Sequence, residues 1–186
     1  MFSQTEKIYM LNLARQAIEY FLKSTVALEI SESDLPSEKL KQNLSCFVTL
    51  TIMGKLRGCI GHLEAFQPLY KDIIENAVSA AFSDYRFKQL TAGELPNLDI
   101  EISVLSESVP LNFTSPQDLL NKLKPNVDGV VINKDGHNAT FLPQVWEELP
   151  DKKEFLSSLC LKAGLNGDAW QEPGLEVSIY TVEVVK

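Results

Sequence analysis

Apolar side chains recur at spacings of three and four residues in several segments of the chain, which is the pattern of amphipathic helices. The first segment begins with a capping box at Ser3 and Glu6, and the second follows Pro68. A shorter one starts at Ser115 with proline next to it, and the last is ended by Gly164. The predicted helices span residues 3–22, 68–82, 115–123 and 151–163.

Strands are predicted where apolar and polar side chains alternate, or where a short apolar run lies between turn residues. Residues 98–104 alternate most clearly, with Asp99, Glu101 and Ser103 on the polar face. Turns are predicted at Gly54 and at residues 134–136, and a shift in apolar parity near Tyr180 predicts a bulge in the last strand. The predicted strands span residues 46–52, 56–60, 98–104, 127–133, 137–142 and 175–184.

The order of these elements predicts the fold class. Neighbouring strands are joined by tight turns, so we expect an α+β protein with a largely antiparallel mixed sheet and packed helices, in preference to a doubly wound fold. The chain has 186 residues and no internal repeat, which suits a single domain over residues 1–186. A smaller lobe is expected at about residues 110–165.

Composition excludes several kinds of partner and site. The net charge of −8 gives no broad basic surface for nucleic acid, although a local basic pocket could still hold one small anion. We expect no signal peptide and no membrane span, because the N-terminus is polar and no apolar run is long enough. Three cysteines, an odd number, favour a reducing compartment, the cytoplasm. No pattern of cysteine and histidine predicts a metal site.

The chemically densest stretch is residues 55–62, which contains Arg57, Cys59 and His62 together with Gly58 and Gly61. Alternation in a strand places Arg57 and Cys59 on one face, where the positive charge would favour a reactive thiolate. His62 could then act as base or second cation. The alternative is that Cys59 is a small buried residue, as free cysteines often are.

Two carboxylates and a second arginine complete the candidate site. Asp84 or Glu101 could orient the His62 ring, giving a nucleophile, a base and an orienting group. Arg57 and Arg86 could form a fork for a carboxylate or phosphate; the alternative is that they form structural salt bridges with Asp84 and Glu101.

The remaining cysteines and the two motif glycines have simpler interpretations. Cys46 and Cys160 lie on predicted core faces and are interpreted as packing thiols. Gly58 and Gly61 could help to bind an anion through nearby backbone N–H groups. Such glycines also mark a bulge, or a place where another backbone or a ligand comes close.

The string LRGCIG at residues 56–61 resembles the signature of the AMMECR domain family, whose prokaryotic members belong to the AmmeMemoRadiSam system. Later blocks are similar too, although Tyr85 and Lys88 stand where many members have proline. These blocks are DYRF at 84–87, LT at 90–91, ELP at 94–96, ATFLPQVW at 139–146 and KAGL at 162–165 with Trp170. The resemblance implies a mixed α+β fold with a larger and a smaller lobe, a cleft between them and a site at the LRGCIG motif.

Two functional classes follow. In the first, the protein is an enzyme with Cys59 as nucleophile or redox thiol, acting on a small anionic or acyl-type substrate. The resemblance implies a pathway shared with Memo-type and radical S-adenosylmethionine proteins. No cofactor of its own is expected, because the chain lacks an iron–sulfur cysteine trio and radical chemistry would belong to the partner. In the second class, the same cleft belongs to a non-catalytic binding or adaptor module that docks a ligand or those partners.

Overall fold

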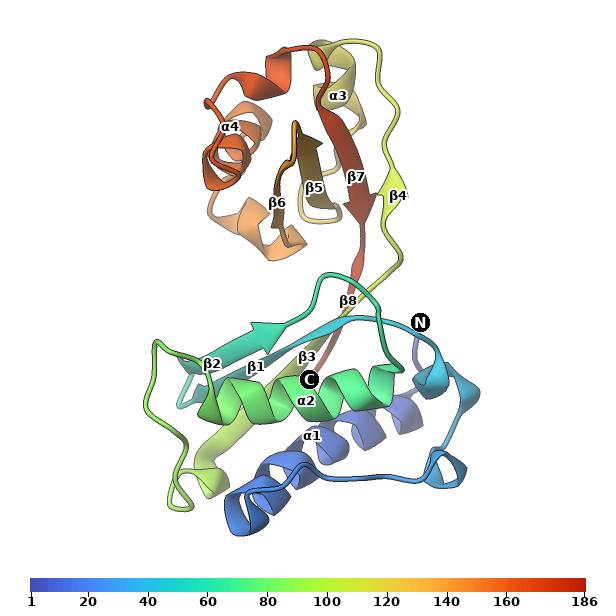
Figure 1. The fold of residues 1–186 in the computed structure, drawn as a ribbon, viewed down its shortest axis with the longest axis vertical. Helices are drawn as coiled ribbons and strands as arrows, with labels where there is room; N and C mark the ends of the chain where they lie inside the picture. Colours follow the sequence, from blue (N-terminus) through green and yellow to red (C-terminus); the bar gives the residue numbers. More distant parts are fainter. The chain divides into compact units, whose positions relative to one another are not determined.

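The computed structural model describes residues 1–186, which form two compact units. The first unit comprises Met1–Leu105 together with Glu183–Lys186, and the second comprises Ser106–Val182. The second unit contains the stretch 110–165 that was expected to form a smaller lobe, and it extends beyond that stretch on both sides. Four α-helices and eight strands are shared between the units (Figure 1).

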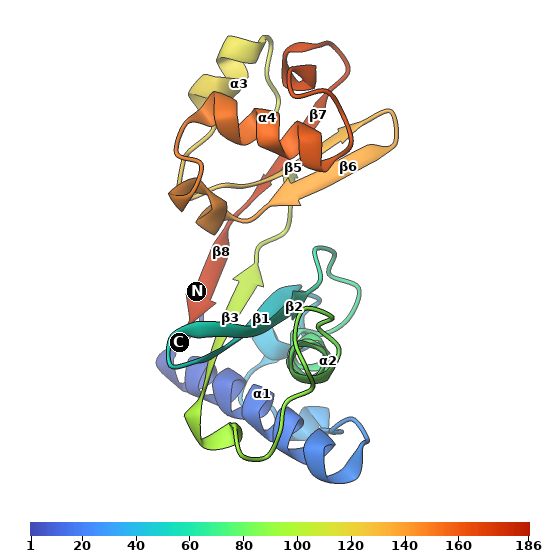
Figure 2. The ribbon, with the colours of Figure 1, turned by 90° about the vertical axis from the view of Figure 1, so that its left-hand side faces the viewer.

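The first unit is a four-stranded sheet with two helices on one face (Figures 1 and 2). The strand order is β2-β1-β3-β8, so β2 is an edge strand. Strands β1 and β2 form a hairpin around Met53 and Gly54, both of which have positive φ, as a two-residue hairpin turn requires. The elements are α1 (Gln4–Ser24), β1 (Cys46–Ile52), β2 (Lys55–Gly61), α2 (Leu69–Phe82), β3 (Leu98–Leu105) and β8 (Val182–Val185).

Alternation along β1 determines which side of this sheet is buried. Val48 and Leu50 are fully buried in a cluster with residues of α1 and α2, whereas Thr49 between them is only half-buried. Side chains in a strand alternate between faces, so Thr49 points to the opposite face, which carries no helix of this unit. We call this second face the open face.

The second unit has its own sheet, with strand order β4-β7-β5-β6. Helices α3 and α4 lie together on one side of its strands (Figure 2). The core includes Trp146 and Phe155, whose rings stack with centroids 3.6 Å apart. The elements are β4 (Val109–Pro110), α3 (Pro116–Lys122), β5 (Gly129–Lys134), β6 (His137–Phe141), α4 (Lys152–Lys162) and β7 (Glu176–Tyr180).

The prediction of one bulged terminal strand over residues 175–184 is wrong. Strands β7 and β8 belong to different sheets, and the break falls at Thr181. Tyr180 is buried in the second unit, where its hydroxyl lies 3.0 Å from that of Thr140, while Val185 is fully buried in the core of the first unit. The shift in apolar parity therefore marks a change of sheet.

The α+β fold class is confirmed, and the pairings between β1, β2 and β3 and between β4, β5, β6 and β7 are antiparallel. The strands are divided between two sheets, where we expected one. No helix is both long and apolar enough to cross a membrane.

Candidate functional site

Cys59 lies on the open face of the first sheet, in the edge strand β2. It pairs directly with Thr49 of β1, and its Sγ lies 3.3 Å from the Thr49 hydroxyl. Thr49 pairs on its other side with Glu101 of β3. Cys59, Thr49 and Glu101 therefore form a row across three strands, which leaves Glu101 about 10 Å from the thiol, too far for contact.

Gly58 faces the other way and allows β2 to pack closely on α2. A Cβ atom on Gly58 would lie 2.1 Å from the carbonyl oxygen of Ala80, which is a backbone atom of the helix. A Cβ on Gly61 would lie 2.3 Å from the Phe47 ring and 2.5 Å from the carbonyl oxygen of Cys46. What approaches Gly58 is thus another backbone, one of the explanations that its position in the sequence left open.

Asp84 and Arg86 hold the backbone of Cys59 from outside the sheet. Asp84 Oδ2 accepts a hydrogen bond from the Cys59 N–H at 2.9 Å, and Arg86 Nη2 donates to the Cys59 carbonyl at 3.2 Å. The two side chains also pair with each other, with Arg86 Nη2 2.7 Å from Asp84 Oδ2. Together they bind the edge of β2 as a neighbouring strand would.

The two members of this pair differ in burial. Asp84 is buried, and its hydrogen bond with Arg86 is the main reason that the pKa of its carboxyl is held well below the ordinary value. Arg86 remains 43% exposed and uses only Nε and Nη2 in these bonds, so Nη1 is free to donate to a ligand. The predicted salt bridge between Asp84 and Arg86 is confirmed, and it leaves one edge of the guanidinium accessible.

Arg57 is engaged differently from what strand alternation predicts. Gly58 pairs with Leu50 but Leu56 pairs with Thr51, so Arg57 is the extra residue of a bulge. The bulge interrupts the alternation, and the side chain of Arg57 binds Glu94 through Nε at 2.7 Å and Nη2 at 3.3 Å.

Glu94 was not predicted as a partner of Arg57, although it belongs to the ELP block. Its carboxylate also accepts hydrogen bonds from the backbone and hydroxyl of Thr91. The bond from Arg57, followed by those from Thr91, lowers the pKa of Glu94 to about 2. The remaining nitrogen of the guanidinium, Nη1, is buried without a partner, so Arg57 offers no accessible edge to an anion.

His62 does not lie beside Cys59. Its Nδ1 is 2.6 Å from Asp72 Oδ1, and Asn76 Nδ2 is 3.2 Å from the same ring nitrogen. Asp72 and Asn76 are buried residues of α2, so the ring lies on the helix-covered side, whereas the thiol is on the open face. The expected contacts of His62 with Cys59, Asp84 or Glu101 are absent.

Asp72 is a residue that the sequence interpretation missed. Its buried carboxylate accepts from the backbone N–H of Cys46 at 2.8 Å, from Asn76 Nδ2 at 2.9 Å and from Gln67 Nε2 at 3.2 Å, besides contacting His62. The available signal was a pair of polar residues four apart, beside the apolar stripe of α2, because such residues share a helix face.

The remaining candidates have structural partners. Glu101 forms an ion pair with Lys186 at 2.7 Å, so the predicted salt bridge between Glu101 and an arginine is wrong. Cys46 and Cys160 are fully buried packing thiols, as predicted, and burial raises the pKa of both. No group of three or more histidine, cysteine or acidic side chains is placed to hold a metal ion.

Thr49 is one of the residues that line a hollow of about 510 Å³ in the first unit. It is lined by Leu11, Arg15, Thr49, Thr51, Asp99, Ile100, Glu101 and Lys186. The neighbour of the Cys59 thiol therefore also borders a space large enough for a small molecule.

Comparisons with known proteins show the family and the fold of this chain. A protein from Methanothermobacter thermautotrophicus is 37% identical over 183 residues, covering 98% of this chain and 94% of its own length. Protein NEQ441 from Nanoarchaeum equitans is 37% identical over 177 residues, covering 92% and 95%. The crystal structure of an uncharacterised protein, PH0010, from Pyrococcus horikoshii superposes with a TM-score of 0.87 at 33% identity, covering 98% of this chain and 92% of that one. The AMMECR1 family model matches residues 11–185, and the chain therefore belongs to the AMMECR1 family.

Proposed function

We propose that Cys59 is the reacting group of this protein, which acts as a thiol-dependent enzyme on a small anionic or acyl-type substrate. The observation that carries the proposal is that both backbone groups of Cys59 are bound by the Asp84–Arg86 pair while its thiol stays on the open face. Fixing the backbone of a reacting residue by charged, partly buried neighbours is how sites are pre-organised.

Arg86 is the residue that we assign to anion binding. Its Nη1 is free and its side chain is 43% exposed, whereas Arg57 is paired with Glu94 and its last nitrogen is buried. Arg86 Nη2 also donates to the Cys59 carbonyl, so the guanidinium lies beside the residue that carries the thiol. The same cation can therefore hold an anionic substrate next to that thiol.

The test compares two alkylating reagents that are similar in size but differ in charge. Cys46 and Cys160 are replaced by alanine and retained folding is checked, which leaves Cys59 as the single thiol. Iodoacetate carries a carboxylate and iodoacetamide is neutral, so the ratio of their rates reports a cation at the thiol, independently of how accessible the thiol is. We expect this ratio to exceed that of free cysteine severalfold and to fall to the free-cysteine value in Arg86→Gln.

Two control variants make the result specific. Lys88→Gln removes an exposed positive charge two residues away from Arg86 and should leave the ratio unchanged. His62→Ala should also leave it unchanged, because the ring contacts Asp72 on the helix side. A thiol that reacts only on unfolding, or with the reagent preference of free cysteine, would overturn the proposal.

The second candidate is a non-catalytic binding or adaptor module that uses the same surface. One observation favours it: the only polar side chain in contact with the Cys59 thiol is the Thr49 hydroxyl, so no base is present to activate it. Both proposals are compatible with the partners that the family resemblance implies, a Memo-type protein and a radical S-adenosylmethionine protein. Both are also compatible with a location in the cytoplasm, where the three free thiols would stay reduced.

A further inference from the structure

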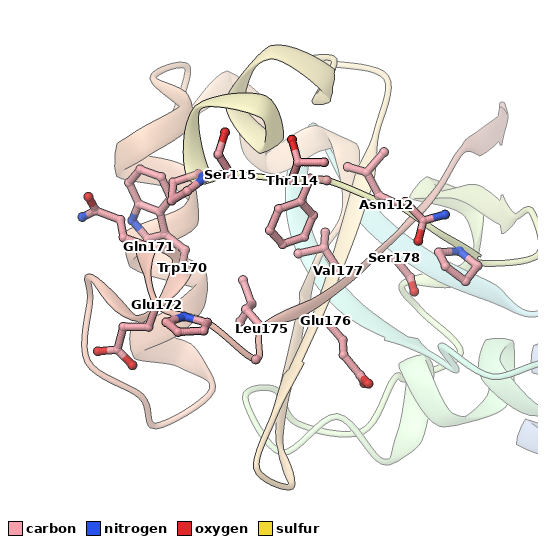
Figure 3. Close-up of a pocket in the computed structure, with 16 residues that line it drawn as sticks. Asn112, Thr114, Ser115, Trp170, Gln171, Glu172, Leu175, Glu176, Val177 and Ser178 are labelled. Carbon is pink, nitrogen blue, oxygen red and sulfur yellow. The ribbon is translucent and has the colours of Figure 1, made fainter.

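The second unit carries a hollow of about 780 Å³ that plays no part in the candidate site (Figure 3). Its floor is apolar and almost fully buried, and is formed by Trp170, Leu175 and Val177. Its rim is exposed, with Asn112 and Thr114 on one side and Gln171 on the other (Figure 3).

The hollow lies where the pairing between β4 and β7 stops. Val109 pairs with Ile179 and Pro110 with Ser178, and the last bond of this ladder runs from the Leu111 N–H to the Val177 carbonyl at 2.8 Å. The chain then turns away toward α3, where Thr114 N–H donates to Asp118. Beyond Leu111, the outer edge of β7 therefore has no neighbouring strand.

Two backbone groups on this edge are left without a partner. The Val177 carbonyl points toward β4, so the N–H and C=O of Glu176 point the opposite way, toward Asn133 of β5. The Leu175 carbonyl shares a peptide plane with the Glu176 N–H, and the Val177 N–H shares one with the Glu176 carbonyl. The C=O and N–H of a trans peptide point in opposite directions, so the Leu175 carbonyl and the Val177 N–H face the hollow. No hydrogen bond is made to either of them within the protein.

We propose that this edge binds an extended peptide segment of a partner protein by β-strand addition. A peptide residue beside Glu176 would donate its N–H to the Leu175 carbonyl and accept from the Val177 N–H, while an aliphatic side chain covers the floor. The residues that line the hollow include no lysine, arginine or histidine, which disfavours a phosphate or carboxylate ligand.

The acidic side chains at the rim do not change this choice. Glu172 forms an ion pair with Lys134, and Glu176 accepts a hydrogen bond from Asn133 Nδ2 at 2.9 Å, so both carboxylates are occupied by residues of β5. In Figure 3 both side chains extend away from the hollow. An uncharged, extended segment is therefore the ligand that matches the edge, since main-chain bonds supply affinity and the apolar floor supplies selectivity.

The test uses a set of capped pentapeptides in which threonine alternates with valine, leucine or phenylalanine. They are titrated into the full-length ¹⁵N-labelled protein at millimolar concentration, and amide shifts and hydrogen exchange are recorded. We expect at least one peptide to shift the Val177 amide and to slow its exchange. The same peptide with its central nitrogen methylated should bind about tenfold more weakly, since it loses a backbone bond and places a methyl group against the strand.

Two matched variants locate the binding. Gln171→Trp fills the hollow from its exposed rim and should abolish the shifts, whereas Gln117→Trp places the same side chain at an exposed position of α3 that does not line the hollow. The proposal is overturned if no peptide shifts the Val177 amide, if the methylated peptide binds equally well, or if Gln171→Trp binds like the unmodified protein.

Discussion

Gly58→Ala is the substitution that tests most directly how the LRGCIG hairpin is held. The new methyl group would lie 2.1 Å from the Ala80 carbonyl oxygen and 3.0 Å from its carbon. A carbon and a carbonyl oxygen in contact need about 3.3 Å, so β2 and α2 must separate locally by about 1 Å. Both partners are backbone, and no change of rotamer can relieve the overlap.

The cost follows from the packing that this separation disturbs. Overpacking a core typically costs about 1–3 kcal/mol and sometimes more, and here the displaced helix carries fully buried side chains such as Ile73 and Ala77. We expect a loss of about 3 kcal/mol in the free energy of unfolding. For a chain of this length that corresponds to a fall of roughly 6–12 °C in Tm.

The assay is urea denaturation followed by far-UV circular dichroism, with calorimetry to check for more than one transition. Tryptophan fluorescence is a poor reporter, because Trp146 and Trp170 both lie in the second unit. Gly93→Ala is the matched control, since a Cβ there meets nothing within 4 Å and its φ is ordinary. It should change stability by no more than about 0.5 kcal/mol, or raise it slightly. An equally small effect of Gly58→Ala would refute the close-packing argument.

Further substitutions test two carboxylates, Glu94 and Asp72. The folded-state pKa of Glu94 is about 2, below the ordinary 4.5, so its contribution to stability is present above pH 4.5 and lost as the pH falls toward 2. Because Glu94 is 31% exposed, we expect about 1 kcal/mol, seen as a shallower acid limb of the stability curve in Glu94→Gln; an unchanged limb would contradict this. Asp72→Ala removes the acceptor for Cys46, Asn76 and His62 and should cost about 3–5 kcal/mol in urea denaturation. His62→Ala should cost markedly less, and equal losses would mean that the buried bonds of Asp72 contribute little.

The candidate site was only partly accessible from the sequence. Strand alternation predicted that Arg57 and Cys59 share one face, and this failed for Arg57 because a bulge adds one residue to β2 and shifts the parity. The pairing of Asp84 with Arg86 was predictable because the two are close in the chain. The pairing of Arg57 with Glu94 joins residues far apart in sequence, and nothing in the spacing of either residue specifies it.

The same limit explains His62. Beyond the end of β2 the direction of a side chain is set by what it meets, and the ring meets a buried carboxylate on α2. An imidazole near a thiol in sequence therefore lies on the other side of the sheet from it. Sequence proximity was a poor guide because His62 lies outside β2, where strand alternation no longer fixes the direction of a side chain.

The sequence by itself determined the local elements of this protein. Capping residues, apolar periodicity and turn glycines gave four helices, two hairpins and an α+β class, because each depends on interactions within a few residues. Tertiary structure alone decided that the strands form two sheets, that the last predicted strand is divided between them, and which carboxylate each cation meets. These features depend on contacts between distant segments, whose free energy comes from burial and pairing in the assembled fold.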